Sequence, residues 1–127
     1  MKINDLYKTN IENLFLNNNF YDFFSNWIVG FTEAEGSFYF VKIENGKLRP
    51  EFRLSQNHNY FLLNKIKETL KLSRKITLQT NSKIHYYLIS VNKKDIENTI
   101  KFFTNKDLVQ LKGKKLLNFQ LWLKGMK

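Results

Sequence analysis

The sequence contains no cysteine, one proline and a single alanine. Without cysteine the chain cannot form disulfides, cysteine-ligated zinc or iron–sulfur sites, or a thiol nucleophile. It also lacks any apolar run approaching the roughly 18 residues that a membrane-spanning helix needs. Its first residues, MKINDLYKTN, have neither the apolar run of a secretion signal nor the Arg and Ser richness of a transit peptide. We therefore expect no membrane partner.

Positive charge dominates the 127-residue chain, with 21 Lys and Arg against 11 Asp and Glu and a formal net charge of +10. Such an excess on one small domain is typical of proteins that bind a polyanion such as nucleic acid. The basic residues are scattered rather than aligned on one long amphipathic helix, which argues against a membrane surface. Phe, Tyr, Met, Ile, Asn and Lys make up half of the chain. Because AT-rich codons encode these residues, we expect a mitochondrion or another organelle with an AT-rich genome.

Hydrophobic spacing predicts an N-terminal extension followed by a single domain over residues 25–127. Residues 1–24 are rich in Asn, and the run Asn17–Asn19 is predicted to break any helix there. Ser25 is predicted to cap a helix that runs to about Glu33 and ends at a glycine.

Two β-hairpins alternate with helices in the rest of the chain. Asn45-Gly46 is a strong turn signal for the first hairpin, and Asn81-Ser82 joins the strands of the second. Pro50 near the start of a strand indicates an edge or a bulge. Asn92 is predicted to cap a helix. The order α-β-β-α-β-β-α predicts an α+β domain with a four-stranded antiparallel sheet and helices on one face. The predicted strands are 37–43, 48–56, 75–80 and 83–91, and the later helices begin near residues 60, 93 and 114.

Alternation along the predicted strands assigns a second, polar face to this sheet. In the first strand, either Tyr39 and Val41 or Phe38 and Phe40 could face away from the helices. A long, basic and partly aromatic face can lie in a DNA major groove and read base edges. An ordinary solvated sheet face is the alternative, because Lys and Thr are common on any exposed strand. The residues assigned to this face are Tyr39, Val41, Arg49, Glu51, Arg53, Lys75, Thr77, Gln79, Lys83, His85 and Tyr87.

The stretch WIVGFTEAEGSF at residues 27–38 closely resembles the LAGLIDADG signature of the homing endonucleases, with its nine core positions at residues 28–36. The predicted element order matches the fold of that family, and the resemblance covers roughly residues 25–123. In the family two such helices pack side by side. The resemblance therefore implies a helix seam that includes Ile28, Gly30, Phe31 and Glu33, with Gly30 allowing close approach. Thr32 stands where the family usually has an apolar residue.

The acidic end of the motif implies metal-dependent chemistry. Glu33 resembles the first acid, which mainly ends the helix and forms hydrogen bonds there. Glu35 resembles the second acid, a metal ligand, and Ala34 the residue whose backbone carbonyl also approaches a metal. Two Glu35 carboxylates brought together need a divalent cation between them, and Mg²⁺ suits oxygen ligands and phosphate substrates. Such an ion would activate water for phosphodiester hydrolysis.

Two further segments extend the resemblance. The segment at residues 52–56, FRLSQ, resembles the FxxSQ segment of the family and makes Gln56 the candidate for positioning the attacking water. LKGKK at residues 111–115 resembles the family's L-K-x-K, which implies that Lys112 lies near the scissile phosphate. We assign Lys114 and Lys115 to nucleic-acid binding.

Two functions fit this sequence. The resemblance implies an intron-encoded, Mg²⁺-dependent homing endonuclease that cuts double-stranded DNA as a homodimer, because only one motif is present. The alternative is a catalytically silent RNA-binding derivative, either an intron maturase or a structural subunit of a ribonucleoprotein such as an organellar ribosome. A basic sheet can bind structured RNA through its backbone and shape.

Overall fold

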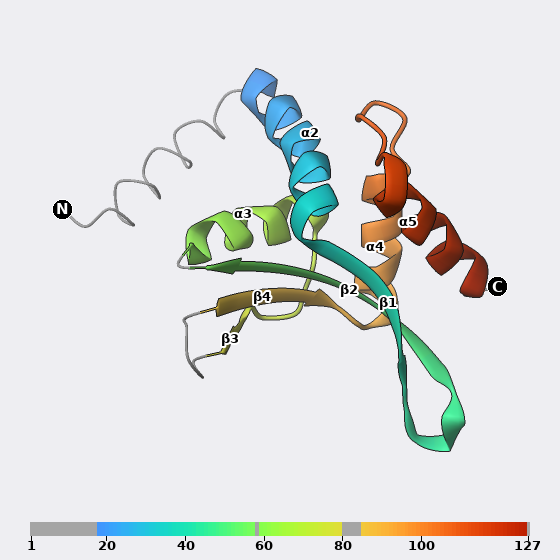
Figure 1. Ribbon diagram of the computed structural model, residues 1–127. Coiled ribbons are helices and arrows are strands. Elements are labelled where there is room, and N and C mark those ends of the chain that lie inside the picture. The colour runs from blue at the N-terminus through green and yellow to red at the C-terminus, as the bar shows by residue number, and fades with distance from the viewer. Residues whose placement is uncertain (1–17, 58, 80–84, 127) are drawn as a thin grey trace.

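The computed structural model describes residues 18–57, 59–79 and 85–126. Four strands form one antiparallel sheet in the order β1-β2-β4-β3, and the helices pack on one side of it (Figure 1). This confirms the predicted α+β class. In chain order the elements are α2 (Asn18–Glu35), β1 (Gly36–Lys42), the 3-10 turn η1 (Glu44–Gly46), β2 (Leu48–Asn57), α3 (Tyr60–Leu70), β3 (Thr77–Gln79), β4 (His85–Ser90), α4 (Lys93–Phe103) and α5 (Gly113–Gly125).

The core lies between the helices and the sheet. Phe52 and Leu54 of β2 and Leu88 of β4 are fully buried, and side chains of every described α-helix pack against them. Burying a side chain of this size contributes about 1.5–3 kcal/mol. A cluster of aromatic rings with centroid separations of 4.9–6.2 Å closes the core where β1 meets α5. Its members are Phe38, Phe52, Phe103, Phe119 and Trp122.

Helix α2 is longer than predicted. It begins at Asn18, so Asn18 and Asn19 do not break the helix, and Ser25 is buried inside it rather than capping it. The predicted boundary between an extension and a domain at residue 25 therefore falls within one helix. Phe24 belongs to the core, and its ring stacks on that of Trp27 at a centroid distance of 5.6 Å. This packing outweighs the weak helix propensity of Asn.

The first hairpin forms as predicted at Asn45-Gly46, where both residues adopt a φ of 75°. Asn and Gly tolerate this left-handed conformation better than other residues. Beyond the turn, Pro50 pairs with Phe40 of β1, whereas pairing between β2 and β4 starts only at Phe52. Pro50 therefore lies where β2 has β1 alone as a neighbour, which satisfies the expectation of an edge position.

The second strand pair is shorter than predicted. Lys75 precedes β3 and is exposed, while the predicted turn at residues 81–82 lies outside the described residues. Asn92 caps α4 as expected, because its side-chain oxygen accepts the Asp95 backbone N–H at 2.8 Å. Within the part of the chain that the structure describes, no helix is both long and apolar enough to cross a bilayer.

Candidate nucleic-acid interface and active site

The sheet face turned away from the helices carries the side chains that alternation assigns to it. Phe52 and Leu54 point into the core, so their neighbours in β2 point outward. Tyr39 pairs directly with Glu51 and therefore lies on the same outward face, which resolves the ambiguity of the first strand. The predicted residues that the structure places on this open face are Tyr39, Val41, Arg49, Glu51, Arg53, Thr77, Gln79, His85 and Tyr87. Lys83 lies outside the described residues.

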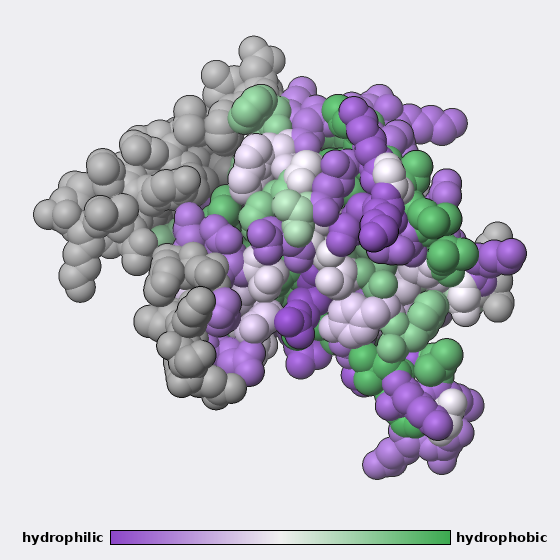
Figure 2. Space-filling model, viewed as in Figure 1, coloured by the Kyte–Doolittle hydropathy of each residue, from purple (hydrophilic) through white to green (hydrophobic). Residues whose placement is uncertain are grey.

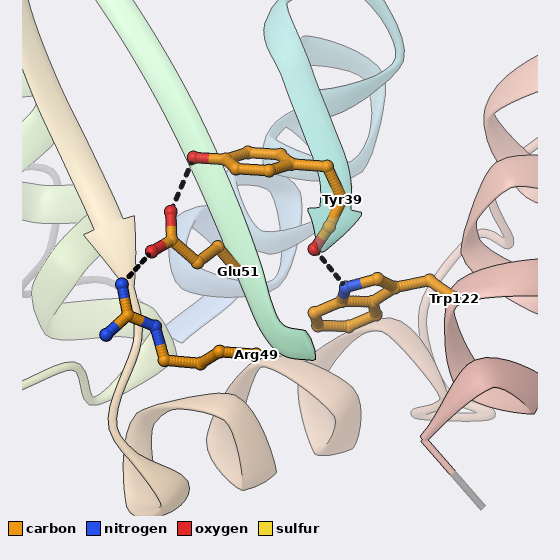
Figure 3. Close-up of polar contacts among 4 residues, drawn as sticks. All are labelled: Tyr39, Arg49, Glu51 and Trp122. Atoms are coloured by element: carbon orange, nitrogen blue, oxygen red, sulfur yellow. Dashed lines mark hydrogen bonds and ion pairs between the residues drawn. The ribbon is translucent and has the colours of Figure 1, made fainter. Parts of the chain in front are cut away.

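A hydrogen-bonded group occupies the β1–β2 part of the open face (Figure 3). The Tyr39 hydroxyl donates to Glu51 Oε2 at 2.8 Å, and Arg49 Nη2 donates to Glu51 Oε1 at 2.7 Å. Glu51 is only 8% exposed. Burial, together with the nearby Glu51 carboxylate, raises the pKa of Tyr39 to about 12, so the phenol remains a donor at neutral pH.

Three more contacts order this face. The Trp122 indole of α5 donates to the Tyr39 carbonyl at 3.0 Å, which ties β1 to the helix layer. Further along, the Arg53 guanidinium lies over the Tyr87 ring, 4.3 Å from its centroid, and the His85 ring stacks beside Tyr87. The face therefore presents guanidinium groups whose orientations are set by neighbouring side chains.

The acidic end of the motif lies where α2 meets β1. Ala34 and Glu35 are exposed at the last turn of the helix. Glu33 is half-buried, and its Oε1 accepts the backbone N–H of Lys112 at 3.0 Å. This agrees with the hydrogen-bonding role that the resemblance implies for the first acid. It also attaches the segment before α5 to the end of α2.

Lys115 is brought closer to the acids than sequence reasoning suggested. Its ammonium donates to the carbonyl of Gly36, one residue beyond Glu35. Lys112, which we expected near the scissile phosphate, has an exposed side chain, and its backbone is what contacts Glu33. Helical spacing could have predicted that Lys115 turns inward. Lys115, Phe119 and Trp122 share the inner face of α5, and the last two are buried.

Gln56 lies at the same end of the sheet. It is two residues beyond Leu54, which pairs with Gly36, and it is half-buried. Its strand parity matches that of Phe52 and Leu54, so it points toward the helix side, where α2 ends. Gln56, Glu35 and Lys115 are thus gathered at one end of the domain.

One face of α2, as the structure describes it, carries exposed residues. Phe23 is 62% and Trp27 is 37% exposed, and Gly30 and Ala34 continue the stripe at helical spacing. A Cβ built on Gly30 would meet no atom of the described residues within 4 Å. Ile28 is completely buried in the domain's own core and does not lie on this face, which corrects its assignment to the seam. Phe31 is half-buried and stacks on Trp27.

Thr32 also lies inside the domain rather than on the open face. It is fully buried, and its hydroxyl donates to the Ile28 carbonyl at 2.8 Å, so its polarity is satisfied within the helix. Gly36 packs against it: a Cβ there would come within 2.5 Å of Thr32 Cγ2. The glycine that follows the acids is therefore required by close packing and not by a left-handed cap.

Hydrophobic side chains reach the surface elsewhere too. Figure 2 shows them along α5 and on the β1–β2 hairpin, where Leu117, Leu121, Ile43 and Leu48 are exposed. Exposure alone therefore does not single out α2. What distinguishes its open face is a glycine at the centre and an exposed carboxylate, Glu35, at the end.

The donors at this end suit a hard divalent cation. Exposed Glu35 supplies a carboxylate, and the last turn of α2 ends in backbone carbonyls, which are also oxygen ligands. Within the described residues, no three His, Asp or Glu side chains of one chain gather closely enough to hold a metal.

Comparisons with known proteins agree with this geometry. The model of the LAGLIDADG endonuclease family matches residues 28–126. A probable intron-encoded endonuclease, Cox1-I1b of Schizosaccharomyces pombe, is 32% identical over 105 residues, which are 80% of this chain and 27% of that protein. The chain therefore spans about a quarter of the length of that relative.

Solved structures resemble the fold over a similar range. The I-LtrWI LAGLIDADG homing endonuclease bound to target DNA has a TM-score of 0.70 and 28% identity, covering 84% of this chain and 37% of that one. The archaeal intron-encoded homing endonuclease I-Vdi141I complexed with DNA has a TM-score of 0.64 and 28% identity, covering 83% and 69%. Enzymes of the matched family generally use divalent metal ions. With the motif, the fold and the family model in agreement, the chain belongs to the LAGLIDADG endonuclease family.

Proposed function

We propose that this chain works as a site-specific, Mg²⁺-dependent DNA homing endonuclease and cuts as a homodimer. The observation that carries the proposal is the open face of α2, which runs past Gly30 to the exposed Glu35. Two copies packed through this face would bring two Glu35 carboxylates together. They would also place two sheets side by side, so that each reads one half of a pseudo-palindromic site.

The residues at the acidic end divide the chemical roles. Bound Mg²⁺ would activate water and stabilise the leaving oxygen. Glu35 and the Ala34 carbonyl would hold the ion, and Gln56 would orient the attacking water. Lys115 is the better candidate than Lys112 for the positive charge beside the scissile phosphate, because its ammonium lies against Gly36.

The open sheet face would supply sequence recognition. Arg49 and Arg53 project from β2, and Thr77, Gln79 and His85 extend the face to its outer edge. Long polar side chains of this kind can reach base edges in the major groove. Lys114, exposed in the first turn of α5, would contact the DNA backbone. We further place the protein in a mitochondrion or another organelle with an AT-rich genome, as the composition suggests.

Cleavage with a matched pair of acid variants tests the proposal. Duplexes selected by the purified protein from a randomised library would be incubated with Mg²⁺ and wild type, Glu35→Gln or Glu44→Gln. Glu44 is an exposed acid in the β1–β2 turn, away from the acidic end. We expect Glu35→Gln to retain binding and lose cleavage, and Glu44→Gln to retain both. Equal cleavage by wild type and Glu35→Gln would contradict the assigned metal role.

Sedimentation separates the two functions that fit the sequence. A dimer that cleaves DNA supports the endonuclease. A monomer that binds structured RNA tightly and leaves DNA intact would instead support the silent RNA-binding derivative, whether a maturase or a ribonucleoprotein subunit.

A further inference from the structure

We infer that Glu51 is a positioning residue that presents Arg49 to a guanine in each half of the DNA site, rather than itself contacting a base. This inference rests on the proposed function. It assigns different roles to two residues of the open face that the sequence treated as equivalent. Arg49 would determine specificity, and Glu51 would fix its orientation.

Glu51 lies at the centre of its group and uses both carboxylate oxygens there. Oε1 accepts from Arg49, two residues earlier on the same face of β2, at 2.7 Å. Oε2 accepts from Tyr39, its direct partner across the strand pair, at 2.8 Å. The Glu51 side chain is 10% exposed against 42% for Arg49. A base could therefore reach the guanidinium much more readily than the carboxylate.

Tyr39 fixes the other side of the carboxylate. Its backbone carbonyl is held by the Trp122 indole, and its hydroxyl points to Glu51 (Figure 3). The chain of contacts from α5 through Tyr39 and Glu51 to Arg49 leaves the guanidinium few alternative orientations. Holding a long side chain in its bound conformation before binding lowers the entropic cost of recognition.

The donors that remain on Arg49 suit guanine. Its Nε is buried and has no hydrogen-bond partner within the described residues, so the exposed part of the guanidinium is its Nη end. Nη2 uses one hydrogen on Glu51, which leaves one on Nη2 and two on Nη1. Two parallel N–H donors from Arg match O6 and N7 of guanine, the most common specific contact in the major groove.

The position of Glu51 also accounts for a carboxylate on a face meant for a polyanion. An unpaired acid there would repel phosphates and weaken binding to every duplex. Because the Glu51 carboxylate is paired with Arg49, it reduces the long-range attraction of this face for DNA only slightly. It instead fixes the orientation of the Arg49 guanidinium. Changing Glu51 should therefore affect discrimination between sequences more than general affinity for DNA.

Selection of duplexes from a randomised library tests this division of roles. We would compare wild type with Arg49→Ala, Glu51→Gln, Tyr39→Phe and the double variant Arg49→Ala/Glu51→Gln. Glu44→Gln serves as the matched loss of an exposed acid. The readouts are base preference at each position, affinity for an unselected duplex, and thermal stability.

We expect wild type to prefer guanine at one position per half-site and Arg49→Ala to lose that preference by about 10- to 100-fold. Glu51→Gln should lose preference at the same position, with affinity for the unselected duplex unchanged or higher. Tyr39→Phe, which removes one hydroxyl and should fold, should show a smaller loss there. The double variant should match Arg49→Ala alone, and Glu44→Gln should match wild type.

Four outcomes would overturn the inference. Loss of a cytosine preference in Glu51→Gln at a position unaffected by Arg49→Ala would mean that Glu51 reads a base itself. An equal fall in affinity for all duplexes would mean that Glu51 is only structural. A selective wild type whose preferences survive both single changes would reject the inference while leaving the proposed endonuclease intact, whereas a wild type that selects no sequence would reject both.

Discussion

Tyr39 links the chemistry of a single residue to the stability of the open face. Its pKa is raised from 10.0 to about 12, first by burial and then by the Glu51 carboxylate that accepts its hydrogen bond. A raised folded-state pKa means that the stabilisation is complete below the unfolded-state pKa and is lost as the pH rises through the folded-state value. The relevant window is therefore pH 10 to about 12.

We expect wild type to be more stable than Tyr39→Phe below pH 10 and to lose this advantage as the pH approaches 12. Urea unfolding of both proteins across the alkaline range measures the difference, in which the titration of lysines cancels. Ultraviolet absorbance should show one tyrosinate of wild type, absent from the variant, that forms only as the pH approaches about 12. Stability curves that stay parallel across this window would contradict the assignment.

The structure and the sequence favour different lysines for the support of cleavage: the structure favours Lys115, and the sequence favoured Lys112. Because the Lys115 ammonium lies at Gly36, we expect Lys115→Met to lower single-turnover cleavage by about 10²-fold. Loss of the hydrogen bond should cost about 1 kcal/mol of stability as well. Lys124→Met, a change at an exposed lysine in the last turn of the same helix, should do neither. Normal cleavage by Lys115→Met together with a loss in Lys112→Met would restore the assignment that the sequence favoured.

At the level of single residues, the sequence was most informative where a motif fixes the position of a side chain. The resemblance to the LAGLIDADG motif implied that Glu33 forms hydrogen bonds at the helix end, and Glu33 accepts one from the Lys112 backbone N–H. Choosing between Lys112 and Lys115 was harder, because both are basic and lie three residues apart. Only the start of α5 at Gly113 decides which of them turns inward.

Among the elements, α2 carries the sharpest prediction. Leucine at Gly30 should leave the fold intact, since a Cβ there meets nothing within 4 Å, but it would block close approach of a second helix. We expect Gly30→Leu to raise the dimer dissociation constant at least about 10-fold without lowering stability, because leucine has the better helix propensity. Sedimentation across a concentration series, together with urea unfolding, measures both effects.

Gly36 supplies the contrasting case within the same motif. Alanine there would place a Cβ 2.8 Å from the Thr32 carbonyl oxygen, so Gly36→Ala should cost about 1–3 kcal/mol of stability. If Gly30→Leu instead behaved like Gly36→Ala and destabilised the chain, its open face would not be a free surface. A dimer that tolerated leucine at Gly30 would show that the copies associate elsewhere.

Strand alternation predicted the sheet well and helix periodicity predicted α2 poorly. A strand has two faces, and Phe52 and Leu54 settle which one is buried. Helix α2 is apolar nearly all round from Phe23 to Phe31, so periodicity could not separate the side that packs within the domain from the side left open. Ile28 was consequently assigned to the wrong side.

For the molecule as a whole, the net charge of +10 predicts strongly salt-dependent binding. If each half-site involves several phosphate contacts, six to ten in all would lose about 10³–10⁵ in affinity between roughly 50 and 200 mM salt. Fluorescence anisotropy with a selected duplex and with an unselected one measures the slopes. A flat profile would contradict nucleic-acid binding altogether.

The contacts that hold the acidic end have one more consequence. Glu33 meets the Lys112 backbone and Gly36 meets Lys115, each across 79 residues of sequence, and Asn26 accepts the Val109 N–H across 83. Contacts so distant in sequence close large loops, and the entropic cost of loop closure slows their formation. During synthesis the motif emerges early but cannot acquire these partners until residues up to Lys115 have left the ribosome. A nascent or truncated chain would thus carry the whole motif before its acidic end is assembled. Under the proposed function, the order of synthesis would therefore delay DNA cutting until the domain is closed.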